Sequence, residues 1–97
     1  MNYTVLLKEE VNTDIKDAYQ WYESRQESLG ERFLEELEDY IKVLKINPQI
    51  YQVRKGNRRY CPMKIFPYLL VYEIEDRNVV IYAVFNAYQH PFRLDKR

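Results

Sequence analysis

Cationic side chains that could hold phosphate or an acidic partner are concentrated in the second half of this chain. Residues 51–97 hold nine Lys or Arg against four Asp or Glu, whereas residues 1–50 hold six against eleven. This split predicts an acidic first half and a basic second half. The formal net charge is zero, which argues against a strong general affinity for nucleic acid. The side chains with the chemistry to contact phosphate are Arg58, Arg59, Lys64, Tyr88, His90, Arg93, Lys96 and Arg97.

His90 and Tyr88 offer chemistry that the other candidates do not. His90 is the one histidine of the sequence, and imidazole is the side chain that exchanges protons near neutral pH. It precedes Pro91 in a terminal segment, where a plain surface role is the simpler interpretation, so His90 alone does not define an active site. Tyr88 lies outside the alternation that explains the strand tyrosines, and it is the best candidate for a ring that stacks on a base.

Arg59 and Lys64 lie five residues apart on one extended segment. Strict alternation along a strand places them on opposite faces, although an irregularity at Pro62 would change this. Two interpretations of this pair are equally good. The two side chains contact phosphate or an acidic segment of a partner, or they are ordinary charges on a strand surface.

Other chemistry has no signature in the sequence. There is no glycine-rich phosphate loop, no paired Cys or His for a metal and no nucleophile motif, so we expect no cofactor, no metal and no small-molecule ligand. The lone Cys61 has no partner for an internal disulfide. An acidic run wraps around a helix and predicts a solvated face rather than a cation site; it comprises Glu35, Glu36, Glu38 and Asp39.

The first half predicts a strand and two helices. Residues 3–8 form a short apolar strand, and Asn12 or Thr13 can cap the helix that follows. On that helix the spacing of three and four predicts a core-facing stripe of Ile15, Ala18, Trp21, Tyr22 and Arg25. Gly30 suits the turn to a second helix, which begins near Glu31 and ends before Pro48. Its core-facing residues are Phe33, Leu37, Ile41 and Leu44.

The second half predicts strands. Extended segments cover residues 51–54, 58–65, 68–74 and 79–85, and short turns join them. The fold class is therefore α+β: an N-terminal strand, a helical hairpin, then a three- to four-stranded antiparallel sheet with the hairpin on one face. One domain spans residues 1–97. No apolar run approaches the ~18 residues of a membrane span, so we expect a soluble cytoplasmic protein.

Several short motifs follow one another in an order that is typical of a known superfamily. They are Ala18 before Trp21-Tyr22, Leu29-Gly30 before Phe33, Asn47-Pro48 before Tyr51, Arg59 before the Phe-Pro-Tyr of residues 66–68, and the runs VYEI and IYAV. With these motifs the chain resembles the RelE/ParE superfamily, the toxins of bacterial type II toxin–antitoxin pairs. The two long helices look more like the ParE branch than the compact RelE branch.

One segment departs from the superfamily. Many relatives carry His-x-x-Arg-x-Pro after the last strand, whereas this chain has Asn86 and Gln89 in place of the His and the Arg and keeps Pro91. The departure leaves the expected fold intact. It puts any shared catalytic activity in doubt.

The resemblance implies a toxin that inhibits growth and stabilises plasmids, and three hypotheses describe how it acts. The leading one is binding to DNA gyrase, as in the ParE branch. The second is metal-independent cleavage of ribosome-bound mRNA, as in RelE, with catalytic candidates Arg58, Arg59, Tyr88, His90 and Arg93. The third is a non-toxic interaction module on the same scaffold.

The toxin hypotheses imply a cognate antitoxin protein as a partner. Such a partner lays an extended or helical segment on the toxin, and we expect it to cross the helical hairpin and the sheet edge near residues 54–60. The residues expected to contact the antitoxin or the target are Arg54, Arg59, Lys64, Tyr88 and Arg93.

Overall fold

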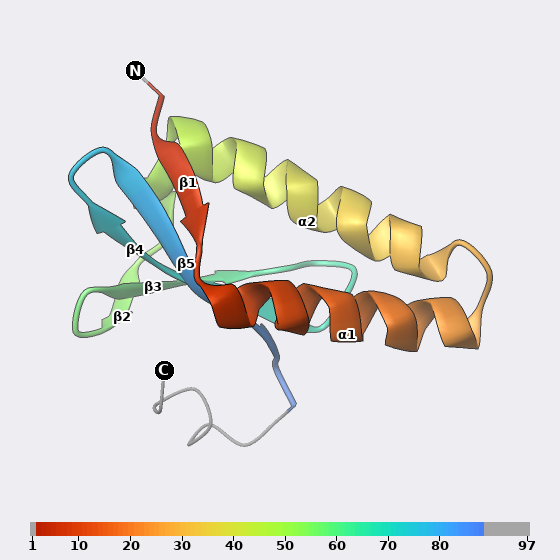
Figure 1. Ribbon diagram of the computed structural model, residues 1–97. Helices are drawn as coiled ribbons and strands as arrows, with labels where there is room; N and C mark the ends of the chain where they lie inside the picture. The colour runs from red at the N-terminus through yellow and green to blue at the C-terminus, as the bar shows by residue number, and fades with distance from the viewer. Residues whose placement is uncertain (1, 89–97) are drawn as a thin grey trace.

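The computed structural model describes residues 2–88, which form five strands, two long helices and one 3-10 turn (Figure 1). The predicted order of strand, two helices and further strands is confirmed. The elements are β1 Thr4–Leu7, α1 Glu9–Arg25, α2 Leu29–Ile46, η1 Pro48–Ile50, β2 Val53–Lys55, β3 Arg58–Pro62, β4 Tyr68–Glu75 and β5 Asn78–Asn86.

The sheet is mixed, with strand order β1-β5-β4-β3-β2. Strands β2 to β5 form an antiparallel meander because short turns join them. β1 pairs in parallel with β5, in the register Thr4↔Asn78 to Leu7↔Ile81 (Figure 1). The predicted antiparallel sheet of three to four strands is confirmed in β2 to β5, and β1 adds a parallel fifth strand that makes the whole sheet mixed. No tight turn dictates the direction of β1, because the whole helical hairpin separates it from the next strand.

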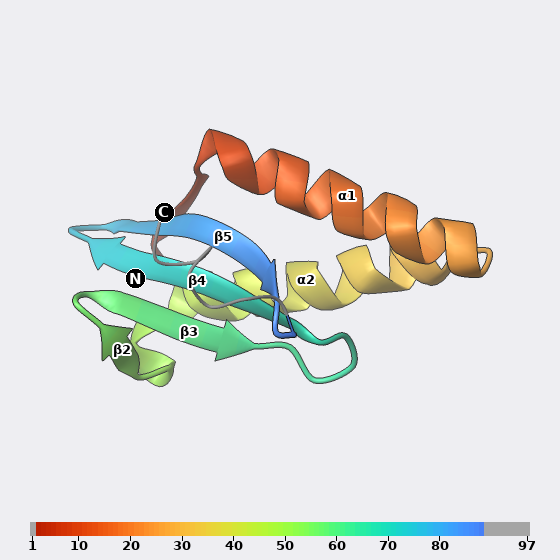
Figure 2. The ribbon, with the colours of Figure 1, turned by 90° about the horizontal axis from the view of Figure 1, so that it is seen from below.

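Both helices cover the same face of the sheet, and the end of the hairpin that joins them projects beyond the strands (Figure 2). The core between the layers includes Phe33, Leu37 and Leu44 of α2, as predicted, and Val11 and Ala18 of α1. Trp21 was predicted to face this core but is 53% exposed. The centroid of its ring lies 3.8 Å from the guanidinium carbon of Arg25, in the last turn of α1.

Four aromatic rings join the hairpin to the sheet. Tyr22 of α1 and Phe33 of α2 contact Phe66 and Tyr68, which flank the start of β4. Ring centroids are 4.6 Å apart for Tyr22–Phe66, 5.4 Å for Phe33–Phe66 and 5.1 Å for Phe33–Tyr68, all with edge-on geometry. Such pairs stabilise a fold beyond the area that they bury. This cluster fixes the angle at which the hairpin leaves the sheet.

The start of each helix differs from its prediction. α1 begins at Glu9, one turn before Asn12 and Thr13, and no side chain caps it. Glu9 and Glu10 instead place negative charge in its first turn, where the helix dipole favours it. α2 begins at Leu29, and Glu23 of α1 accepts the N–H groups of Ser28 at 2.9 Å and Gly30 at 3.0 Å. The cap of α2 is therefore supplied by a side chain of the preceding helix.

Gly30 lies inside the first turn of α2 rather than in the connection, where Ser28 takes the left-handed conformation at φ 68°. A Cβ atom at Gly30 would lie 2.7 Å from the Tyr19 carbonyl oxygen and 2.8 Å from Tyr19 Cδ1. Only glycine allows the two helices to approach this closely.

We predict that Gly30→Ala destabilises the protein, because the backbone of Tyr19 must move away from the new methyl group. Overpacking of this kind costs about 1–3 kcal/mol. Urea unfolding measures the loss, and Glu27→Ala, at an exposed position of the connection, is the matched control. Equal unfolding midpoints for the two variants would contradict the close approach.

Burial also raises the pKa of several groups, among them one thiol and one phenol of the core. It raises the pKa of the Cys61 thiol from 9.0 to about 11 and the pKa of the Tyr72 phenol from 10.0 to about 12. The folded protein therefore holds these protons more tightly than the unfolded chain does. The associated stability is complete below pH 9 and is lost as the pH rises through the folded values.

We accordingly expect the urea midpoint to fall between pH 9 and pH 11, with Cys61 dominating the start of that fall. A series of unfolding curves from pH 7 to pH 11 measures it. In Cys61→Ala the absolute stability is lower because a cavity forms, but the midpoint should stay flat up to about pH 10. The same slope from pH 9 to pH 10 in both proteins would refute this assignment.

Candidate functional site

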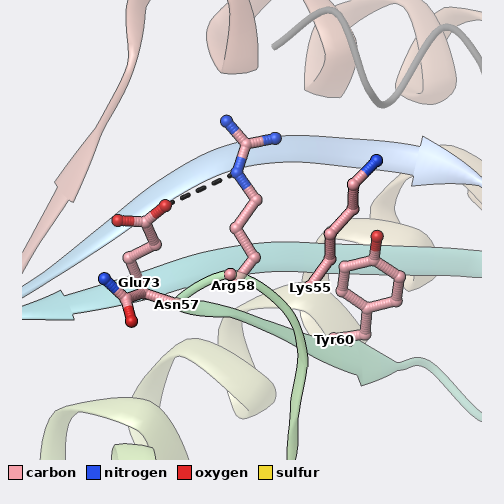
Figure 3. Close-up of a pocket in the computed structure, with 6 residues that line it drawn as sticks. Lys55, Asn57, Arg58, Tyr60 and Glu73 are labelled. Atoms are coloured by element: carbon pink, nitrogen blue, oxygen red, sulfur yellow. Dashed lines mark ion pairs between the residues drawn. The ribbon is translucent and has the colours of Figure 1, made fainter.

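A small pocket opens on the sheet at the turn between β2 and β3. Its volume is about 180 Å³, and Gly56 forms the turn with φ +58°. Figure 3 shows Arg58 directed toward Glu73 of β4, and Lys55 next to the ring of Tyr60. The lining residues are Lys55, Gly56, Asn57, Arg58, Tyr60 and Glu73.

Arg58 is held by an acidic and an aromatic neighbour. Its Nε lies 3.5 Å from Glu73 Oε2, and its guanidinium carbon lies 4.8 Å from the centroid of the Tyr82 ring. Lys8 Nζ lies 5.3 Å from the centroid of the same ring. The Tyr82 hydroxyl donates to Glu75 Oε2 at 2.8 Å, and this hydrogen bond raises the pKa of Tyr82. Two cations thus share one aromatic ring.

A β-bulge places Tyr82 in this group. Val71 pairs with Ala83 and Tyr72 with Ile81, so that Tyr82 is the extra residue of β5. Ile81 before the bulge and Val84 after it both belong to the core under the helices. Simple alternation would place these two side chains on opposite faces of the sheet, so the bulge changes the face that β5 presents. Bulges of this kind redirect side chains near functional sites.

Arg59 points to the helical side of the sheet, away from Arg58. Its Nη1 donates to the carbonyl oxygen of Tyr51 at 2.6 Å and reaches that of Gln49 at 3.5 Å. The hydroxyl of the neighbouring buried Tyr72 donates to the Pro48 carbonyl. The structure therefore separates the two adjacent arginines, and Arg59 holds the segment that leaves α2.

The remaining candidates from the sequence are scattered over the surface. Arg54 lies on the exposed edge strand β2, and Lys64 lies in the loop after β3. Tyr88 is 87% exposed, and its N–H binds Asn86 Oδ1 at 2.8 Å. His90, Arg93, Lys96 and Arg97 lie outside residues 2–88.

Sequence reasoning missed the partners of these residues. Glu73 and Lys55 join the Arg58 group because β4 and β2 pair with β3, whereas Lys8 joins it through the Tyr82 ring. The register that pairs Arg59 with Tyr72 places Glu73 opposite Arg58. Glu36 was predicted to be solvated with its acidic neighbours. It instead accepts three backbone N–H groups, those of Lys64 at 3.1 Å, Ile65 at 2.9 Å and Phe66 at 3.2 Å.

No metal or membrane feature accompanies this site in the described part of the chain. Residues 2–88 contain no group of three acidic, His or Cys side chains that could hold a metal ion. None of the helices between these residues is both long enough and apolar enough to cross a membrane.

We predict that Arg59→Ala lowers the stability more than Arg58→Ala does. Arg59 makes charged hydrogen bonds to backbone carbonyls, which contribute about 1.5–3 kcal/mol each, whereas a surface pair such as Arg58–Glu73 contributes about 0–1 kcal/mol. Urea unfolding of the two neighbouring variants measures the difference. A larger loss in Arg58→Ala would show that the Arg59 contacts do not support the fold.

Solved structures share this fold. The chromosomal ParDE toxin–antitoxin system from P. aeruginosa matches with a TM-score of 0.63 and 12% identity over 87% of this chain and 95% of that one. The isolated E. coli RelE toxin matches with a TM-score of 0.58 and 14% identity over 97% and 94%. The archaeal RelE–RelB complex from Pyrococcus horikoshii OT3 matches with a TM-score of 0.56 and 16% identity over 93% and 100%.

The sequence itself matches one family model. No curated protein matches it, but residues 5–91 match the model of the ParE toxin of the type II toxin–antitoxin system parDE. This match covers most of the chain, and the solved neighbours agree with it in fold. The chain therefore belongs to the ParE toxin family of type II toxin–antitoxin systems, within the RelE/ParE superfamily.

Proposed function

We propose that this toxin inhibits bacterial growth by binding DNA gyrase and that its antitoxin neutralises it. The observation that carries the proposal is the separation of Arg58 and Arg59 on opposite faces of the sheet. Cleavage of RNA without a metal requires several groups to converge on one phosphate: a base, cations and an acid. The Arg59 guanidinium instead binds backbone carbonyls of the segment that follows α2, and it lies on the opposite face of the sheet from Arg58.

The projecting hairpin supports action by protein binding. Near its end, the Arg25 guanidinium carbon lies 3.8 Å from the centroid of the exposed Trp21 ring. Trp and Arg are the side chains that most often dominate binding energy at protein interfaces. The exposed Arg54, Lys64 and Tyr88 are further proposed contacts with gyrase or the antitoxin, and Arg93 is proposed with them from the sequence alone.

A second candidate function, cleavage of ribosome-bound mRNA, is favoured by the pocket at Lys55, Arg58 and Tyr60. A pocket with two cationic side chains and a phenol offers contacts to a phosphate and a base. In this alternative Arg58 and Tyr88 act with His90 and Arg93, and Arg59 serves the fold.

Pulse-labelling of new DNA and new protein separates the two functions. The chain is induced in bacteria without its neighbouring gene, and we expect DNA synthesis to fall within minutes while translation continues. The purified chain should also inhibit supercoiling by gyrase, less strongly as Trp21→Ala than as the control Arg58→Ala. An early fall of protein synthesis, with Arg58→Ala abolishing toxicity, would overturn the gyrase proposal in favour of mRNA cleavage.

A further inference from the structure

One stripe of α2 faces away from the core. Its members lie four, three, four and three residues apart, which places them on one side of the helix at about 100° per residue. The buried residues Phe33, Leu37 and Leu44 occupy another side, and every member of the stripe is exposed except the half-buried Glu36. We call this the α2 stripe: Arg32, Glu36, Asp39, Val43 and Ile46.

The C-terminal half of the α2 stripe is apolar. Val43 and Ile46 are exposed, Ile46 to 69%, and the chain beyond them continues with the exposed Ile50 of η1 and Val53 of β2. These four residues are close in sequence and account for nearly half of the large exposed apolar side chains in the described residues. Exposed apolar residues that are close along the chain, two of them on one helix face, indicate an interaction site more strongly than single scattered residues do.

The N-terminal half of the α2 stripe borders an acidic groove. The groove lies between α2 and the loop before β4, with a volume of about 160 Å³, and Ile65 on its rim is 67% exposed. Glu36 holds the opposite wall in place through its three hydrogen bonds to the loop backbone. Three carboxylates face one guanidinium, so that the groove is net negative; its lining residues are Arg32, Glu35, Glu36, Asp39, Ile65 and Phe66.

We infer that the α2 stripe and this groove bind an amphipathic, basic helix of the antitoxin. A Lys or Arg of that helix enters the groove toward Glu35 and Asp39, and apolar side chains one to three turns further along cover Val43 and Ile46. The inference rests on the toxin–antitoxin pairing and not on the identity of the target.

Charge and shape select this partner. A straight stripe with spacings of three and four is the surface against which a second helix packs. The negative groove repels the acidic segment that would suit the basic pocket at Arg58 and attracts a cationic one. The stripe belongs to the helical layer, whereas the Arg58–Tyr82 contact lies on the opposite face of the sheet. The two surfaces can therefore bind different partners.

Calorimetric titration of the purified chain with the protein encoded by its neighbouring gene tests the inference. The double variant Asp39→Lys, Ile46→Lys places cations on the stripe at exposed positions, and we expect the Kd to rise about tenfold or more. Two controls are Glu38→Lys, an exposed acid of α2 off the stripe, and Leu6→Lys, an exposed apolar residue of β1. Each should change the Kd less than about threefold.

Charge reversal in the partner provides the second readout. Changing the contacting Lys or Arg of the neighbouring-gene protein to Glu should weaken binding to the wild type and restore binding to Asp39→Lys. An unchanged Kd for the double variant, or no complex with the wild type, would overturn the inference. The gyrase proposal fails separately, since its readout is DNA synthesis in cells that lack the partner.

Discussion

The contact between the helical hairpin and the start of β4 is the constraint on which the rest of the structure depends. Tyr22, Phe33, Phe66 and Tyr68 bring three separate segments to one point, and edge-on ring packing allows few alternative arrangements. With that point fixed, α1 runs along β5, where the Asp14 carboxylate accepts the Val84 N–H at 3.1 Å. β1 leaves part of the edge of β5 unpaired, and there a helix side chain accepts the hydrogen bond of a strand N–H.

As a result of this arrangement, side chains on the two faces of the sheet make different kinds of contact. Residues that face the helices, such as Arg59 and Tyr72, donate hydrogen bonds to backbone carbonyls between α2 and β2. Residues on the other face, such as Arg58 and Tyr82, interact through charge and ring contacts near the surface. Adjacent positions in the sequence therefore make different kinds of contact, because side chains of a strand alternate between its two faces.

Periodicity and turn chemistry predicted the elements and most of the α2 core, and the resemblance of short motifs to known toxins predicted the family, because all of these signals are local in the sequence. What they missed depends on tertiary structure. Trp21 follows the helical spacing but is exposed, and Gly30 serves a helix–helix contact rather than a turn. The direction of β1, the bulge at Tyr82 and the hydrogen bonds of Glu36 each join segments far apart in the chain. The candidate site was predicted least well, because strand pairing brings its residues together and they are not neighbours in the sequence.

The way in which Glu36 holds its loop has an evolutionary consequence. The carboxylate binds only backbone N–H groups of Lys64, Ile65 and Phe66, so the exposed side chains of Lys64 and Ile65 take no part in the contact. Mutations at these two positions can alter the rim of the groove while the loop keeps its conformation. Related toxins can thus diverge in which antitoxin they accept, and avoid cross-reaction between paralogous pairs, without losing the shared scaffold.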